Sequence, residues 1–173
     1  MIYNQNKIPK DQWRYGFRSS AAVGCGWIAT YNALQLLGKP ESPQKLIKYY
    51  ERQLPLINGN FGTQFWGPYV YFKNRGFETK LVLNPEKYDE CAGDVNILFY
   101  HWHSGLKLGA HFVCIQRTED GFVSYNTYKN STGPNKIGNS IQKFATNSGR
   151  FWTALITVKK PSPLGKGDRV SGG

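Results

Sequence analysis

The sequence predicts an α+β fold in which a helical first half is followed by an antiparallel sheet. Apolar residues recur at helical spacing early in the chain, whereas the second half contains short β-branched and aromatic runs joined by tight turns. Helices first and strands second is the order typical of α+β proteins. In this chain of 173 residues, we expect one domain over residues 1–160, large enough to bury a core, and a flexible tail over residues 161–173.

The first two predicted helices have clear termini. An apolar stripe over residues 25–37 predicts the first helix, which Gly38 ends in a left-handed conformation. Ser42 is placed to cap the second helix, with Pro43 at its first helical position and Pro55 after its end. The residues before the first helix lack periodicity and predict an irregular, aromatic-rich lead-in.

The third predicted helix lies in the segment "QFWGPYVYFKNR", which follows a loop. Thr63 is a candidate N-cap and Gly76 ends the segment, although Pro68 favours a later start near residue 67. A strand over residues 77–83 follows, and the segment "NPEKYDEC" predicts one more helical turn.

The second half predicts the sheet. Residues 94–103, 110–117 and 121–128 form three β-rich runs separated by the turns "SGLKLG" and "TEDG". The segment "NSIQKFATN" predicts a short helix, and residues 151–160 predict a last strand. Turns this short join antiparallel neighbours, so we expect an antiparallel sheet.

The charge and hydropathy of the chain restrict its partners. Lys and Arg outnumber Asp and Glu by 22 to 11, a net charge of +11 that favours anionic partners such as an anionic polymer. The cations are scattered singly, however, which is typical of a solvated surface and does not favour nucleic-acid binding. No apolar run approaches the roughly 18 residues of a membrane span, and the N-terminus lacks a signal peptide's apolar core. We therefore expect a cytoplasmic protein, or a domain excised from a larger or exported one.

The cysteines and histidines do not predict a metal site. Cys25, Cys91 and Cys114 form neither a disulfide framework nor a zinc-binding spacing, which is typical of a reducing compartment. Cys114 lies inside an apolar strand and is expected in the core, and Cys91 has no histidine near it in sequence. His101 and His103 share one face of a predicted strand, but no Asp, Glu or Cys stands beside them. We expect no metal and no cofactor.

Cys25 is a candidate nucleophile. Only the thiolate attacks, and free backbone N–H groups at the start of a helix favour it by lowering the thiol pKa. Gly24 and Gly26 flank Cys25 and are expected to leave open space around the sulfur. The alternative is that Cys25 is a small core residue beside two turn glycines.

His111 and Asn126 are the candidate partners of this thiol. His111 begins one predicted strand, and Asn126 lies fifteen residues later at the end of the next. A hairpin would bring the two together, so that Asn126 accepts from the ring N–H and fixes the tautomer of the base. Two alternatives remain open: His111 is a structural histidine, or His101 or His103 takes the orienting role.

These motifs together resemble the papain-like cysteine peptidases, in particular the bacterial branch related to double-glycine-leader peptidases that process bacteriocin precursors. The resemblance covers residues 12–158 and rests on "VGCGWIATYNALQLLG", "GAHFVCI", "SYNTY" and the intervening "FGTQFWGPYVYFKNRGFETKLV". It implies a papain-like fold, in which the nucleophile helix packs on the C-terminal sheet. It also implies Cys25 as nucleophile, His111 as general acid/base and Asn126 as the orienting residue.

The sequence departs from this family at one position. Family members carry an oxyanion-stabilising Gln some six to eight residues before the cysteine, where this chain has Ser19 and its neighbours. The nearest preceding Gln is Gln12, which we take as the candidate donor together with the backbone N–H of Cys25.

The resemblance implies a thiol peptidase that acts on a peptide or protein through an acyl-enzyme. Cleavage after Gly-Gly, in a leader or at a self-processing site, is one option because the chain ends "GKGDRVSGG". The alternatives are a catalytically silent peptide-binding module and a cell-wall amidase or effector toxin with the same triad.

Overall fold

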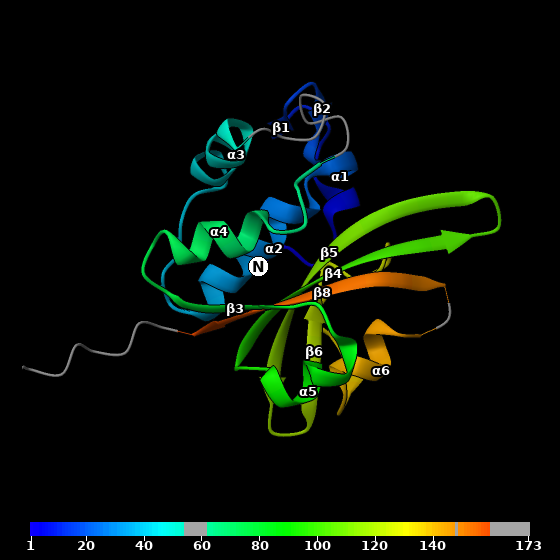
Figure 1. Cartoon of the computed structure of the whole chain (residues 1–173). Helices are drawn as coiled ribbons and strands as arrows, with labels where there is room; N and C mark the ends of the chain where they lie inside the picture. Colours follow the sequence, from blue (N-terminus) through cyan, green and yellow to red (C-terminus); the bar gives the residue numbers. More distant parts are fainter. Residues whose placement is uncertain (54–61, 148, 160–173) are drawn as a thin grey trace, which may run out of the picture.

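A computed structural model describes residues 1–53, 62–147 and 149–159 (Figure 1). The helical elements are η1 (Gln5–Lys7), α1 (Ser20–Val23), α2 (Cys25–Leu36), α3 (Pro43–Arg52), α4 (Gly67–Lys73), η2 (Pro85–Lys87), α5 (Tyr88–Cys91) and α6 (Ile141–Ala145). The strands are β1 (Arg14–Tyr15), β2 (Arg18–Ser19), β3 (Glu78–Val82), β4 (Val95–Ser104), β5 (Lys107–Thr118), β6 (Gly121–Tyr125), β7 (Asn135–Gly138) and β8 (Arg150–Lys159). The predicted tail over residues 161–173 lies outside the described part of the chain.

The main sheet has six antiparallel strands in the order β3-β8-β4-β5-β6-β7. The last strand in sequence, β8, therefore lies inside the sheet, between β3 and β4. The strands β1 and β2 form a separate small hairpin.

Helices cover both faces of this sheet. In Figure 1, α2 and α4 lie on one side and α5 and α6 on the other. The side chains of β5 illustrate this arrangement. Phe112 and Cys114 belong to the core cluster under α2, whereas Val113 and Ile115 pack with the α5 and α6 side. Successive strand residues point to opposite faces, so a continuous apolar run buries both.

Most predicted helix termini are confirmed. The Ser42 side chain accepts from the Lys45 amide at the start of α3, and Gly38 takes a φ of +66° after α2. The cap predicted at Thr63 is wrong, because α4 begins at Gly67 and the Thr63 hydroxyl pairs with the hydroxyl of Tyr15 instead. The end predicted at Pro55 lies outside the described residues.

The strand predictions differ from the structure at three places. The hairpin between β4 and β5 is tighter than predicted, because Gly105 adopts a φ of +59° and lets pairing extend to Ser104 and Lys107. Strand β7, with four residues, and the β1–β2 hairpin, with two residues per strand, were not predicted. Strands this short carry no readable alternation.

No helix in the described ranges is both long and apolar enough to cross a bilayer. All three cysteines are free, and Cys114 is buried in the core as predicted.

Candidate active site

Cys25 is the first residue of α2, directly after the short turn of helix that ends at Val23. The glycines on either side of it are required by close packing. A Cβ on Gly24 would lie 2.5 Å from the Ser20 carbonyl oxygen, and one on Gly26 would lie 2.4 Å from the Thr63 side chain. The prediction that the glycines leave open space around the sulfur is therefore wrong. Their small size instead lets Ser20 and Thr63 pack close to the helix start.

The thiol of Cys25 is protonated at neutral pH. Cys25 is 9% exposed and belongs to the core cluster under α2. Burial raises its pKa to about 11, although the backbone amides of Phe112, Gly26 and Cys25 itself partly offset this increase. The helix start therefore lowers the Cys25 pKa, as predicted, but desolvation raises it by more.

The neighbours of the sulfur place it beside β5. The amide directed at it belongs to Phe112, the residue after His111. Cys25 and His111 both lie in the described part of the chain, and no hydrogen bond joins the Cys25 thiol to the His111 ring. In this arrangement the sulfur lies against β5 at Phe112 and is not paired with the imidazole.

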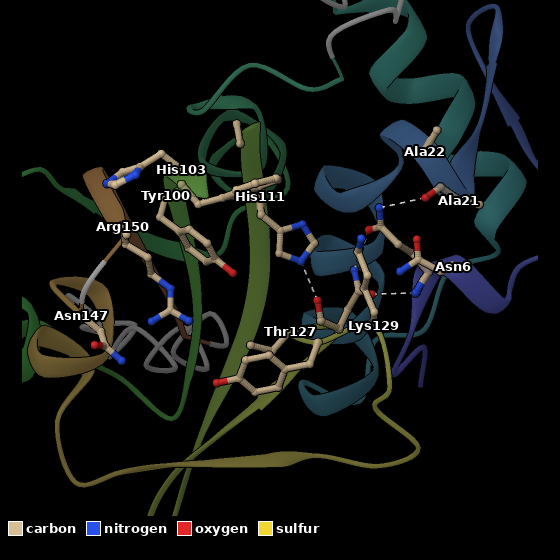
Figure 2. A pocket seen from close by; sticks show the side chains of 16 residues that line it. Asn6, Ala21, Ala22, Tyr100, His103, His111, Thr127, Lys129, Asn147 and Arg150 are labelled. Carbon is tan, nitrogen blue, oxygen red and sulfur yellow. Dashed lines mark hydrogen bonds between the residues drawn. The ribbon is translucent and has the colours of Figure 1, made fainter. Parts of the chain in front are cut away.

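His111 and Asn126 are brought together by the β5–β6 hairpin. His111 Nε2 lies 2.6 Å from the backbone oxygen of Asn126, fifteen residues later (Figure 2). A carbonyl oxygen only accepts, so Nε2 carries the proton and Nδ1 keeps its lone pair. The predicted partner residue is present, but its contact uses the main chain and not the carboxamide.

The imidazole of His111 is neutral at neutral pH. Burial is the main cause of its lowered pKa, and the positive charge of Arg150 lowers it further. The hydrogen bond to Asn126 acts in the opposite direction. A neutral imidazole with a free Nδ1 is the form that can accept a proton.

The carboxamide of Asn126 binds Gln5. The backbone N–H of Gln5 donates to Asn126 Oδ1 at 2.7 Å, and Asn126 Nδ2 donates to Gln5 Oε1 at 2.9 Å. Gln5 Nε2 in turn donates to the Ala21 carbonyl of α1 at 3.1 Å. Asn126 has a φ of +62°, a left-handed conformation that Asn tolerates better than most residues. Gln5 therefore links the end of β6 to the turn of helix before Cys25.

A pocket of about 580 Å³ opens beside these residues (Figure 2). It is lined by Gln5, Asn6, Ala21, Ala22, Tyr100, Trp102, His103, Ala110, His111, Asn126, Thr127, Tyr128, Lys129, Asn147, Gly149 and Arg150. Cys25 is not among them. His111 and Asn126 thus line the pocket, whereas Cys25 does not.

The structure places Gln12 elsewhere. Gln12 is exposed and lines a separate surface hollow with Met1 and Ile8. Gln5, which the sequence analysis did not select, is the glutamine that lines the pocket of His111. Gln5 lies twenty residues before Cys25, and no local pattern marks it, because its position depends on how the lead-in folds back across the domain.

The other two histidines lie in different environments from each other. His101 stacks on Phe151 and lies edge-on to Phe99, and its buried Nδ1 has no partner among the described residues. His103 is exposed and lines the pocket on the side of Arg150. Within residues 1–53, 62–147 and 149–159, no group of three or more His, Cys, Asp or Glu side chains could hold a metal ion.

No protein-family model matches the chain, and no curated protein sequence does so either. Among solved structures, the fold is similar to the peptidase domain of Streptococcus ComA, a bi-functional ABC transporter involved in a quorum-sensing pathway. The two share 16% sequence identity with a TM-score of 0.50, over 78% of this chain and 91% of that one. This similarity confirms the papain-like α+β fold that the sequence resemblance implied.

Proposed function

We propose that this protein is a cysteine peptidase that cleaves a peptide or amide bond through an acyl-enzyme. Cys25 is the nucleophile, His111 the general acid/base and Asn126 the residue that orients His111. The hydrogen bond between His111 Nε2 and the Asn126 backbone oxygen carries the proposal. This bond leaves His111 Nδ1 to act as the base. The next residue on the same strand, Phe112, directs its amide at the Cys25 sulfur.

The reaction starts from a neutral thiol and a neutral imidazole. The Cys25 side chain turns from the Phe112 amide toward His111, and Nδ1 takes the thiol proton as the sulfur attacks the substrate carbonyl. Protonated His111 then gives the proton to the leaving amine, and water hydrolyses the thioester. Proton transfer by a placed base contributes about 10²–10⁴-fold to such rates.

The oxyanion is stabilised by the backbone N–H of Cys25 at the start of α2, where unpaired amides and the helix dipole favour negative charge. Gln12 is not part of this proposal, because it is exposed in a separate hollow. Gln5 is a positioning residue, since its backbone N–H and its side chain hold the carboxamide of Asn126.

The test is covalent trapping with a neutral probe, a Gly-Gly chloromethyl ketone, together with turnover of an acetylated Gly-Gly aminomethylcoumarin substrate. Gly-Gly is the first sequence to try because the chain resembles the double-glycine-leader peptidases. The wild type should form one adduct, located on Cys25 by mass spectrometry, and release the fluorophore. Cys25→Ala and His111→Ala should lose both signals, and Cys114→Ala, the matched control at a second buried cysteine, should keep them.

A second candidate function is a peptide-binding module without catalysis. The buried, protonated thiol of Cys25 and its absence from the pocket lining favour this alternative. A labelled peptide that binds the pocket, with no adduct on Cys25 and no turnover, would support it over the peptidase. Digestion of purified peptidoglycan would indicate instead a cell-wall amidase that uses the same three residues.

A further inference from the structure

The pocket beside His111 has a positively charged lining. Arg150 and Lys129 line it, and no aspartate or glutamate of the described residues does so. Tyr100, Tyr128 and several amides supply further polar groups to its wall. A concave site with convergent cations and hydroxyls is suited to an anionic group.

Arg150 is fixed in place by the protein around it. One of its nitrogens donates to the Phe144 carbonyl at 2.7 Å, and the guanidinium lies 4.1 Å from the Phe144 ring centre and 4.9 Å from that of Tyr100. A second hydrogen bond from the guanidinium goes to the Tyr100 hydroxyl. A guanidinium has five N–H donors in a planar fork, so these two bonds leave donors for a ligand. A held guanidinium also loses little side-chain entropy when a ligand binds.

Arg150 lies close to the proposed base. Tyr100 touches both, with its ring centre 5.9 Å from that of His111, and Figure 2 shows the Tyr100 ring between the other two side chains. The cation also acts on both groups. Burial raises the pKa of Tyr100 and lowers that of His111, and the charge of Arg150 lowers both. An anion bound at Arg150 would therefore lie within a few residues of the bond that His111 helps to cleave.

We infer that this pocket is a specificity subsite for a carboxylate of the peptide substrate, with Arg150 as its principal ligand and Lys129 at its rim. This inference rests on the proposed function for the position of the scissile bond, but it makes a claim about binding that can be tested without turnover. The carboxylate comes from an acidic side chain near the cleaved bond or from a free C-terminus of the peptide.

The experiment measures binding to the Cys25→Ala variant, which removes turnover. The probes are fluorescent peptides that carry Gly-Gly, with Glu or its neutral match Gln placed in turn at each of the three positions on either side. One arm uses peptides with amidated C-termini, and a second uses the all-Gln peptide with a free C-terminus. Fluorescence anisotropy gives each dissociation constant.

The expected result is that Glu at one or two positions, or the free C-terminus, binds about tenfold more tightly than its neutral match. Arg150→Gln, made in the same Cys25→Ala background, should abolish this preference, and Arg150→Lys should keep part of it. Lys107→Gln removes an exposed charge at the β4–β5 hairpin, away from the pocket, and should change nothing. Thermal unfolding of each variant reports whether it is folded.

Equal affinities for the Glu and Gln peptides at every position and for both forms of the C-terminus would overturn the inference. A preference that survives in a folded Arg150→Gln variant would also overturn the role of Arg150. The two proposals fail separately. Charge-dependent binding without a Cys25 adduct in the wild type would reject the peptidase only, and turnover without charge preference would reject the subsite only.

Discussion

The two sides of the candidate site differ in packing. The start of α2 is tightly packed, with Cys25 in the core cluster and glycines on either side that admit no Cβ. The pocket that His111 lines is also lined by two cations, Arg150 and Lys129. The proposed nucleophile therefore lies in a packed region that does not line the pocket, whereas the proposed base does. In the proposed reaction, the thiol has to leave its packed position to reach the base.

The largest expected effect is on the pH dependence of thiol chemistry. Because burial raises the Cys25 pKa to about 11, the rate of its alkylation by iodoacetamide should rise about tenfold per pH unit from pH 7 and level off only near that pKa. Peptide mass spectrometry would follow Cys25, with the half-buried Cys91 as an internal reference. A plateau near the free-thiol pKa of about 8.5 or below it would show that the resting thiol is not controlled by burial.

Removal of the base should affect turnover and the alkylation of Cys25 differently. His111→Ala should lower kcat for the Gly-Gly substrate by about 10²–10⁴-fold. Alkylation of Cys25 at pH 9 should change by less than about twofold, because no hydrogen bond joins the thiol to this ring in the resting structure. A matched fall in alkylation would instead indicate a preformed thiolate–imidazolium pair.

Added side-chain volume at the packed start of α2 should destabilise the protein. Gly26→Ala places a Cβ 2.4 Å from the Thr63 side chain and should lower the free energy of unfolding by about 1–3 kcal/mol. Urea denaturation would measure this loss. Thr63→Ala removes the Oγ1 part of the clash but also the hydrogen bond to Tyr15. The double variant Gly26→Ala/Thr63→Ala is therefore compared with Thr63→Ala alone, and against that reference Gly26→Ala should cost less than in the wild type. An unchanged unfolding midpoint in the single variant would mean that the helix start is not tightly packed.

Loss of Gln5 should have the smallest effect on stability and a specific effect on the site. Gln5→Ala leaves Asn126 Nδ2 without its acceptor and should cost about 1–2 kcal/mol. Because Asn126 holds His111, kcat should fall while KM for the neutral Gly-Gly substrate stays within about twofold. Gln5→Glu retains an acceptor for Asn126 Nδ2 and should recover part of kcat. If Gln5→Ala lowers stability but leaves kcat unchanged, Gln5 is structural and does not position the base.

Much of the fold could be predicted because its signals are local. The cap at Ser42, the left-handed glycine after α2 and the apolar runs of β4, β5 and β8 can each be recognised within a few neighbouring residues. The short strands β1, β2 and β7 could not be recognised, because two to four residues are too few to show an alternation. Thr63 failed as a cap because its hydroxyl bonds to Tyr15, forty-eight residues earlier.

The candidate residues were selected from sequence, but their contacts were not. Chain order and strand separation brought Cys25, His111 and Asn126 forward as a set. The choice of Gln12 as a donor rested on proximity in sequence, whereas the structure places Gln5 at the pocket. The hydrogen bond between Gln5 and Asn126 joins residues that are 121 positions apart. No local pattern covers that separation.

The sequence by itself determined the helix and strand segments, their order and the residue types available for thiol chemistry, since these follow from short-range periodicity, capping and composition. Only the tertiary structure decided that β8 lies between β3 and β4, that Asn126 offers its backbone oxygen to His111, and that Cys25 is protonated. The reason is that strand order, hydrogen bonds between distant segments and desolvation all depend on which parts of the chain come together after folding. The charge that Arg150 brings to the pocket is decided in the same way.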